Sequence, residues 1–151
     1  MEYIELETGS IIRYIKDITD NKLQYLYHKI PEDFTKPSIY FPTPEFRTIL
    51  SSTSSYILNY MWLIKIFAPT TEKAYEIARN INFVISNNRF LIPIINMDGS
   101  KSNKAFTVTN SSISKADEGV YTLQIDWNSV RYYTENEVQK MRKHFESYKF
   151  K

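Results

Sequence analysis

Acidic side chains are the residues of this 151-residue chain whose types and spacing come nearest to catalytic chemistry. They form two adjacent pairs, Glu32–Asp33 and Asp117–Glu118. Two carboxylates can act as general acid and general base when they converge on one site. Each pair lies in a predicted turn, where acids accept hydrogen bonds from the local backbone. We therefore interpret both pairs as turn residues and not as a catalytic dyad.

Histidines and loop motifs supply no further catalytic signature. His28 and His144 have no partner at metal-ligand spacing, so we interpret both as surface side chains. The segment MDGS, Met97–Ser100, resembles the start of a calcium loop, but the later oxygen ligands and the closing Glu are missing, which favours a turn. The chain has no cysteine, and its three glycines form no phosphate-binding loop. The sequence thus predicts no catalytic residue, cofactor, metal or small-molecule substrate, and no enzyme.

The composition is typical of a single folded domain spanning residues 1–151, with 42% hydrophobic and 24% charged residues. Its net charge of +2 is too small to indicate nucleic-acid binding by itself. The acidic start MEYIELETGS does not resemble a signal peptide. The apolar run YMWLIKIFA is interrupted by Lys65 and is too short to cross a bilayer. We expect a cytosolic protein without membrane contact.

Helical spacing of apolar residues predicts three helices. The first covers Ile11–Ile18, with Ser10 as its N-cap. The second begins at Thr70 or the residue after it, and its apolar period runs through Ala74–Ile85. The third, Thr134–Lys151, opens with a capping box and carries an apolar stripe. We expect this last helix to be an appended contact element.

The remaining extended segments predict a mostly antiparallel sheet. The longest, Ser55–Ala68, is apolar on both faces and is expected to be central. The segment Val120–Trp127 alternates, which predicts a half-buried strand with one polar face, whereas Asn110–Ser114 is interpreted as a polar loop. Further strands are predicted at Asn21–Lys29, Ser38–Phe41, Phe46–Leu50, Arg89–Asn96 and Lys104–Thr109. Together the elements predict an α+β domain with helices packed on one face of the sheet.

Four of the six prolines lie between Lys29 and Glu45 and flank the strand SIYF, Ser38–Phe41. Proline in a sheet is confined to edges, first positions and bulges, so this strand is predicted at a sheet margin. Such a strand is either protected by its own chain or offered to a neighbour. If the strand is offered to a neighbour, we expect a subunit contact at or near the residues Ile39, Tyr40, Phe41 and Phe46.

Two basic segments indicate contacts of another kind. Lys101 and Lys104 lie at a predicted hairpin tip, which would reach into a channel if the domain lined one. The segment Lys140–Lys151 carries five basic residues against one Glu. It is either a solvated helix face or a contact with nucleic acid or an acidic surface.

Four segments in a fixed order resemble the tail terminator proteins of bacteriophages, also called tail completion or tail-to-head joining proteins. The segments are IPEDFTKPSIYFPTPE, YMWLIKIFAPTTEKAYEIARNI, NRFLIPIINMDGS and DEGVYTLQIDWNS, and the likeness covers Ile11–Tyr133. None of the four is a catalytic motif.

The resemblance implies a ring of six copies at the head-proximal end of the tail tube. Such a ring stops tube polymerisation, joins the tube to a neck, connector or collar protein, lets DNA pass through its lumen, and meets the sheath in a contractile tail. It also implies location in a virion tail or tail-like particle assembled in the bacterial cytoplasm. Two alternatives remain open: another neck or tube-like morphogenesis subunit, and a small soluble α+β enzyme or ligand-binding domain.

Overall fold

The computed structural model describes the backbone of residues 2–133, with side chains described from Leu6 onward. The predicted helix Thr134–Lys151 lies outside the described residues. Neither helix in the described range combines the length and hydropathy needed to cross a membrane. In chain order the elements are α1 (Glu2–Ile18), β1 (Gln24–Tyr27), β2 (Ser38–Phe41), β3 (Glu45–Leu50), β4 (Ser55–Phe67), α2 (Thr71–Asn87), β5 (Leu91–Ile95), β6 (Lys101–Asp117) and β7 (Val120–Tyr132).

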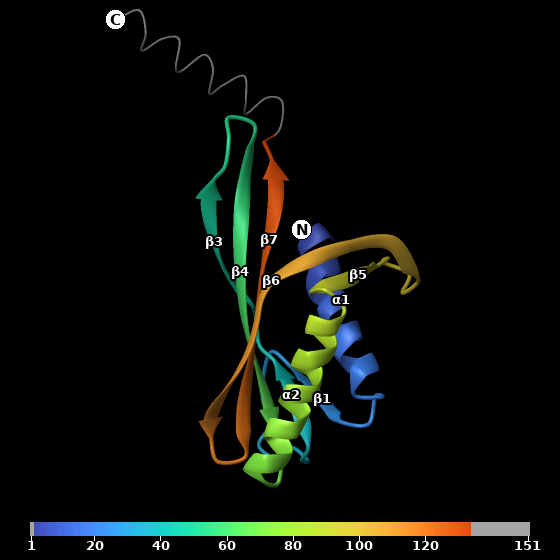
Figure 1. Ribbon diagram of the computed structural model, residues 1–151, viewed down its shortest axis with the longest axis vertical. Coiled ribbons are helices and arrows are strands. Elements are labelled where there is room, and N and C mark those ends of the chain that lie inside the picture. The colour runs from blue at the N-terminus through green and yellow to red at the C-terminus, as the bar shows by residue number, and fades with distance from the viewer. Residues whose placement is uncertain (1, 134–151) are drawn as a thin grey trace, which may run out of the picture.

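The strands form one curled sheet in the order β1-β2-β4-β7-β6-β5, and β3 also pairs with β4. All pairs are antiparallel except β1 with β2. Strand β4 is central because β7 lies along one side of it while β3 and β2 divide the other side. Both helices lie on the same side of this sheet, as Figure 1 shows. The predicted α+β class, with helices on one face, is confirmed.

Helix α2 begins and ends where its capping residues predict. Thr70 accepts a hydrogen bond from the backbone N–H of Lys73 at 3.2 Å, and Asn88 follows the last turn. The residues that α2 turns toward the sheet are fully buried: Ala74, Ala78, Ile81 and Ile85. The predicted period thus identifies the packed face of this helix.

Helix α1 starts at Glu2, eight positions before the predicted N-cap, and the prediction for Ser10 is wrong. Ser10 is buried inside the helix, where its hydroxyl donates to the carbonyl of Leu6 and accepts from the N–H of Ile95 at 2.9 Å. Serine can stay inside a helix when its hydroxyl bonds back to the preceding turn. The apolar spacing of Ile11 and Ile15 was interpreted correctly, because both are fully buried.

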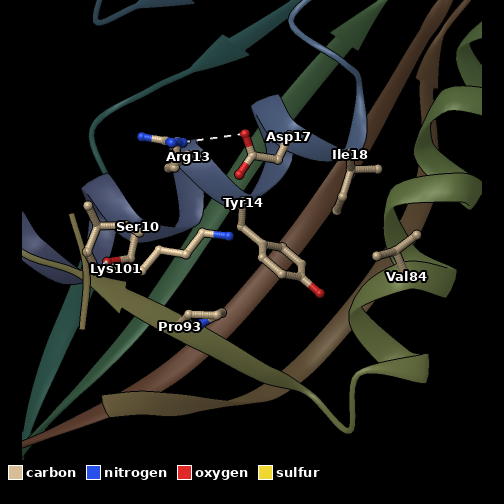
Figure 2. Close-up of a pocket in the computed structure, with 9 residues that line it drawn as sticks. Ser10, Arg13, Tyr14, Asp17, Ile18, Val84, Pro93 and Lys101 are labelled. Atoms are coloured by element: carbon tan, nitrogen blue, oxygen red, sulfur yellow. Dashed lines mark hydrogen bonds and ion pairs between the residues drawn. The ribbon is translucent and has the colours of Figure 1, made fainter. Parts of the chain in front are cut away.

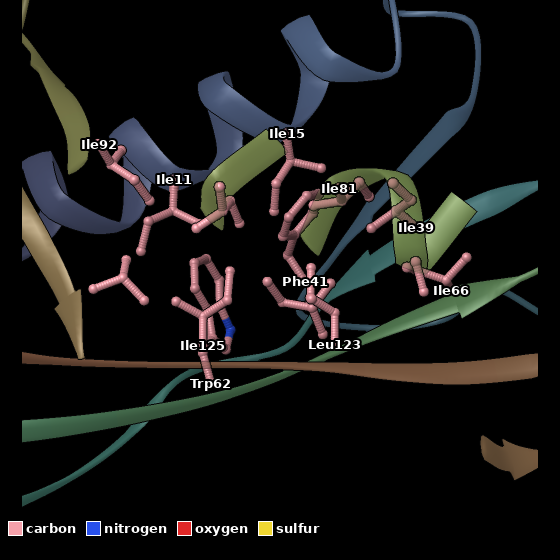
Figure 3. Close-up of a cluster of buried hydrophobic side chains, with 14 of the residues drawn as sticks. Ile11, Ile15, Ile39, Phe41, Trp62, Ile66, Ile81, Ile92, Leu123 and Ile125 are labelled. Carbon is pink, nitrogen blue, oxygen red and sulfur yellow. The ribbon is translucent and has the colours of Figure 1, made fainter. Parts of the chain in front are cut away.

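The core lies between these helices and the sheet face that they cover, here called the helix face. Figure 3 shows isoleucines of α1 and α2 meeting aromatic and branched side chains of the strands. Strand residues that point into this core are 0–2% exposed, among them Trp62, Ile64, Leu123 and Ile125. The opposite face, here called the far face, has no helix on it among the described elements.

Strand β2 is an interior strand, and the prediction that it lies at a margin is wrong. Residues Ser38–Tyr40 pair with β4, and the whole of β2 pairs with β1 on its other side. Pro37 sits just before the strand and Pro42 just after it, so neither proline removes a donor from the ladder. Prolines that flank a strand are compatible with an interior position.

Strand β6 also differs from its prediction, because the supposed polar loop Asn110–Ser114 is part of it. Ser111 and Ile113 pair with β7, and a tight turn at Gly119, with φ of +73°, joins the two strands. Serine and asparagine are depleted in strands, which is why the sequence favoured a loop. The long pairing with β7 overrides that local preference.

Candidate assembly surface

Three strands continue past the helices and form a projecting arm, seen at the top of Figure 1. The arm consists of β3 and the adjoining parts of β4 and β7, Ser55–Tyr60 and Trp127–Tyr132. Because β4 pairs with both neighbours, their residues form rows that run straight across the arm. We describe the surface row by row.

The far face of the arm carries an apolar row made of Ile49, Ile57 and Val130. Ile49 is 38% exposed and Val130 is 48% exposed. The next outward residue on that face of β7, Tyr132, is 75% exposed. Exposed apolar patches of this kind mark contact sites in folded proteins.

A polar row and an aromatic row hold the arm together. Arg47 donates to the Asn59 amide oxygen at 3.3 Å, and Asn59 donates to Asn128 at 2.6 Å. On the helix face, Tyr60 stacks on Trp127 with ring centroids 4.8 Å apart and planes 6° apart. Phe46 lies 5.3 Å from Tyr60 and remains 55% exposed. Such cross-strand pairs stabilise the sheet within the arm.

Both long edges of the arm are open. In the described part of the chain, β3 pairs only with β4, and β7 from Asn128 to Tyr132 pairs only with β4. Strand β6 runs beside β7 only as far as the pair Val108–Trp127 and then turns away to β5. Open backbone edges pair readily with a strand of another chain.

At its root the arm is tied to α1 through Glu7, which is only 2% exposed. The indole N–H of Trp127 donates to a carboxylate oxygen of Glu7 at 2.7 Å. Burial raises the pKa of Glu7, while hydrogen bonds from Trp127 and Ser129 and the charge of Arg131 act in the opposite direction. A buried carboxylate of this kind couples the helix to the arm.

The predicted contact residues fall into two groups. Ile39 is 0% exposed and Phe41 is 2% exposed, because both point into the chain's own core between β2 and α1. Their side chains are therefore unavailable to a neighbour. Tyr40 is partly exposed and its hydroxyl donates to the carbonyl of His28 at 2.9 Å. Phe46 lies in the arm, so the contact hypothesis remains for Tyr40 and Phe46.

Lys101 and Lys104 are both exposed on the hairpin of β5 and β6. Lys101 borders a hollow of about 290 Å³ between α1 and β5, shown in Figure 2. Arg13 and Asp17, 3.4 Å apart, form an exposed ion pair on its rim. The hollow gathers no pair of carboxylates and no imidazole, so its chemistry is that of a surface groove.

The acidic pair Asp117–Glu118 and Asp98 have local roles. Asp117 accepts the backbone N–H of Glu118 at 2.8 Å, and Lys115 donates to Glu118 at 2.9 Å. The bonds from Lys115 and then Thr71 lower the pKa of Glu118. Asp98 of the MDGS turn accepts two bonds from Ser100, which lower its pKa. Among the described residues, no three His, Cys, Asp or Glu side chains are grouped to hold a metal.

The open edges of the arm and the buried Glu7 were both missed by sequence reasoning. Strict alternation of apolar and polar residues ends at Trp127, because Asn128 and Ser129 are both polar, so the full length of β7 is not evident from the sequence. An open edge of a sheet has no signal in the sequence, because it depends on which strands fail to pair there. The burial of Glu7 likewise depends on the distant Trp127.

The chain is similar in sequence to two Bacillus subtilis (strain 168) proteins. It is 28% identical to the uncharacterized protein YqbJ over 145 residues, covering 96% of this chain and 95% of YqbJ. It is 24% identical to the phage-like element PBSX protein XkdJ over 131 residues, covering 87% and 88% of the two chains. No family model matches. A chain in the solved virion of a native gene transfer agent particle aligns with a TM-score of 0.47 and 6% identity, covering 83% of this chain and 93% of that one.

Proposed function

We propose that this protein is a structural subunit of a phage tail or phage-tail-like particle. The observation that carries the proposal is the arm, which presents exposed apolar side chains and two open strand edges at one end of the molecule. Features of this type serve binding between proteins. The similarity to a protein of the phage-like element PBSX supports the phage setting.

Within that class, we propose the role of tail terminator. A ring of copies, six by the family resemblance, would sit at the head-proximal end of the tail tube and stop its polymerisation. Ring closure requires two different and complementary surfaces on each subunit, and the two edges of the arm differ in this way. The partners would be the tube protein on one side and a neck, connector or collar protein on the other.

The same proposal assigns roles to the two basic segments. Lys101 and Lys104 would face the lumen, where DNA passes without sequence-specific contact. The segment Thr134–Lys151 would contact the sheath or collar in a contractile tail. Both segments would act in a tail or tail-like particle assembled in the host cytoplasm.

Deletion of the gene in the host that carries it tests the terminator role. Tails lacking a terminator are expected to vary widely in length under the electron microscope, and expression of the intact gene should restore a single length. Tails of uniform normal length in the deletion strain would exclude the terminator role.

A neck connector or tube-like subunit is the second candidate, because an arm with open edges suits any ring of a tail. Deletion of a connector gives separate heads and tails of normal length, and loss of a tube subunit leaves no tube. The three outcomes therefore distinguish the candidates in one experiment.

A further inference from the structure

We infer that neighbouring copies join arm to arm, with β7 of one copy pairing in parallel with β3 of the next. The paired segments are Asn128–Arg131 and Arg47–Leu50, so that each row across one arm continues into the next arm. This inference rests on the proposed function, since it names the partner of the arm as a second copy of the same chain.

Strand direction supports this joint. Strands β3 and β7 are both antiparallel to β4, so they run parallel to each other at opposite sides of the arm. When copies are related by rotation about a ring axis, arms that lie along that axis point the same way. The β7 edge of one copy then meets the β3 edge of the next in the parallel sense, and the sheet continues from copy to copy.

The lengths of the two open edges match. On β7 the open edge begins at Asn128, because β6 occupies the position beside Trp127. On β3 the strand begins just after Pro44, which cannot donate a hydrogen bond and limits the edge at that end. Both edges reach the tip of the arm, where Tyr133 bonds to the carbonyl of Ser54 at 3.0 Å. The two segments therefore present strand edges of equal length.

The rows across the arm end in side chains of matching chemistry. The far-face rows end in Ile49 and Val130 in one case and in Arg47 and Asn128 in another, so apolar meets apolar and donor meets acceptor. Two rows match less well: Leu50 would lie beside Arg131, whose aliphatic stem can pack against it, and Glu45 would face the carboxylate of its row on β7, Asp126. Asp126 pairs with Asn110 of β6, which places Asp126 outside the joint.

The outer edge of β6 offers an internal contrast. From Thr109 to Asp117 this edge pairs with no strand of the described chain, and its residues are mostly polar, with Ser, Asn, Thr and Lys. Polar and charged side chains are the usual protection of a strand edge that must stay single. The arm edges carry Phe46, Ile49 and Val130 instead, which favours a partner. Since the two arm edges differ, copies join head to tail and not as a two-fold pair.

Disulfide trapping tests the joint, and the absence of native cysteine makes the readout clean. The full-length double variant I49C/V130C is oxidised and run on a denaturing gel without reductant. Within one chain the two positions flank Ile57, two strand spacings or about 9–10 Å apart. This exceeds the ~7 Å limit for a disulfide, so a bond can form only between copies. A ladder of covalent oligomers that collapses under reductant is expected.

Three controls make the result specific. The single variants I49C and V130C should stay monomeric, because a head-to-tail joint brings unlike positions together. The pair I49C/S114C moves one cysteine to an exposed far-face position on β6, outside the joint, and should also stay monomeric. The pairs I49C/N128C and I49C/Y132C keep the same face and should give weaker ladders, since they require a register shifted by two residues.

A single monomer band from I49C/V130C would overturn the inference. Oxidation traps even short-lived contacts between copies, so a joint that forms at all should give a ladder. Dimers from I49C alone would overturn it too, since they indicate a two-fold β3–β3 pair. Either result leaves the proposed function intact if deletion of the gene still gives tails of uncontrolled length. Uniform tails in the deletion strain would instead exclude the terminator role while a ladder still identified the joint.

Discussion

The arm and the helix-covered body share the same two long strands but are stabilised in different ways. In the body, β4 turns Trp62, Ile64 and Ile66 into a core that both helices cover, and these side chains are 0–2% exposed. In the arm, the same strand buries Leu58 and Tyr60 on its helix face but leaves Ile57 and Asn59 partly exposed on the far face, within cross-strand rows. The core of the body is therefore held by burial under both helices, whereas the far face of the arm is held by pairing between strands.

This difference explains why the arm suits assembly. The far face of the arm has no covering layer, and three strands gain stability when another strand is added at an edge. The helix face of the body is already packed by the chain's own helices. Glu7 links the two regions, since it belongs to α1 and receives the indole N–H of Trp127 at the root of the arm.

The largest predicted effect is a loss of stability, and it is compared between the two regions by changing one isoleucine of β4 in each. Ile64→Ala in the body is expected to cost about 2–5 kcal/mol of unfolding free energy, because it leaves a cavity in a packed core. Ile57→Ala in the arm is expected to cost about 1 kcal/mol or less, since its side chain is partly exposed and no helix lies over it. Urea unfolding of both variants measures the contrast. Equal losses would show that the arm is packed as tightly as the body.

The elements of the body could largely be predicted because each repeats a clear pattern. The period of Ala74, Ala78, Ile81 and Ile85 identified α2 and its buried face, and the start was expected at Thr70 or Thr71, of which Thr70 is the N-cap. The doubly apolar strand Ser55–Ala68 was correctly expected at the centre of the sheet. Local propensity and burial agree in these segments, and such agreement allows the structure to be predicted from the sequence.

The arm and the margins of the sheet could not be predicted for an equally physical reason. Pairing partners decide whether a strand is interior, and the prolines flanking Ser38–Phe41 do not reveal that β1 lies on its other side. The same limit applies to the predicted contact residues: Ile39 and Phe41 are buried in the chain's own core, while Tyr40 and Phe46 remain at the surface. An open edge is a property of the whole sheet.

The second prediction concerns the contact between α1 of the body and the root of the arm, within one chain. Glu7→Ala is expected to cost about 1–3 kcal/mol, because it leaves the buried indole N–H of Trp127 without an acceptor. The matched control Glu76→Ala, an exposed acid on α2, should change stability by about 0.5 kcal/mol or less. Thermal or urea unfolding measures both. If the two variants lost the same amount, Glu7 would contribute nothing to holding α1 against the arm.

The third prediction is a pH dependence of stability that arises from Glu7, at the same contact between α1 and the arm. Burial raises the folded-state pKa of Glu7 above the ordinary value of 4.5, although Trp127, Ser129 and Arg131 oppose the shift. The folded protein therefore holds this proton more tightly than the unfolded chain does. The stability that Glu7 contributes is fully present below pH 4.5 and is lost as the pH rises through the raised pKa.

Comparison with Glu7→Gln isolates this contribution, because exposed acids such as Asp98 and Glu118, whose pKa values are lowered, affect both proteins equally. The unfolding free energy of the variant, relative to the native sequence, should increase as the pH rises from 4.5. Urea unfolding at a series of pH values measures the difference. Parallel curves for the two proteins would mean that burial does not shift the pKa of Glu7.

The smallest effect on stability is expected at the edges of the arm, where the effect on assembly should be greatest. Phe46→Ser and Val130→Asp replace side chains that are 55% and 48% exposed, so each should change unfolding free energy by about 0.5 kcal/mol or less. Val130→Asp nevertheless places a charge in the apolar row of the joint, and the oligomers measured by sedimentation should fall to single chains.

Phe83→Ser is the matched control for these edge variants, because Phe83 is 56% exposed on α2 of the body and should leave sedimentation unchanged. If Phe83→Ser abolished oligomers while the arm variants kept them, copies would meet through the helices. The body would then be the assembling region, and the arm would have to meet another component of the particle.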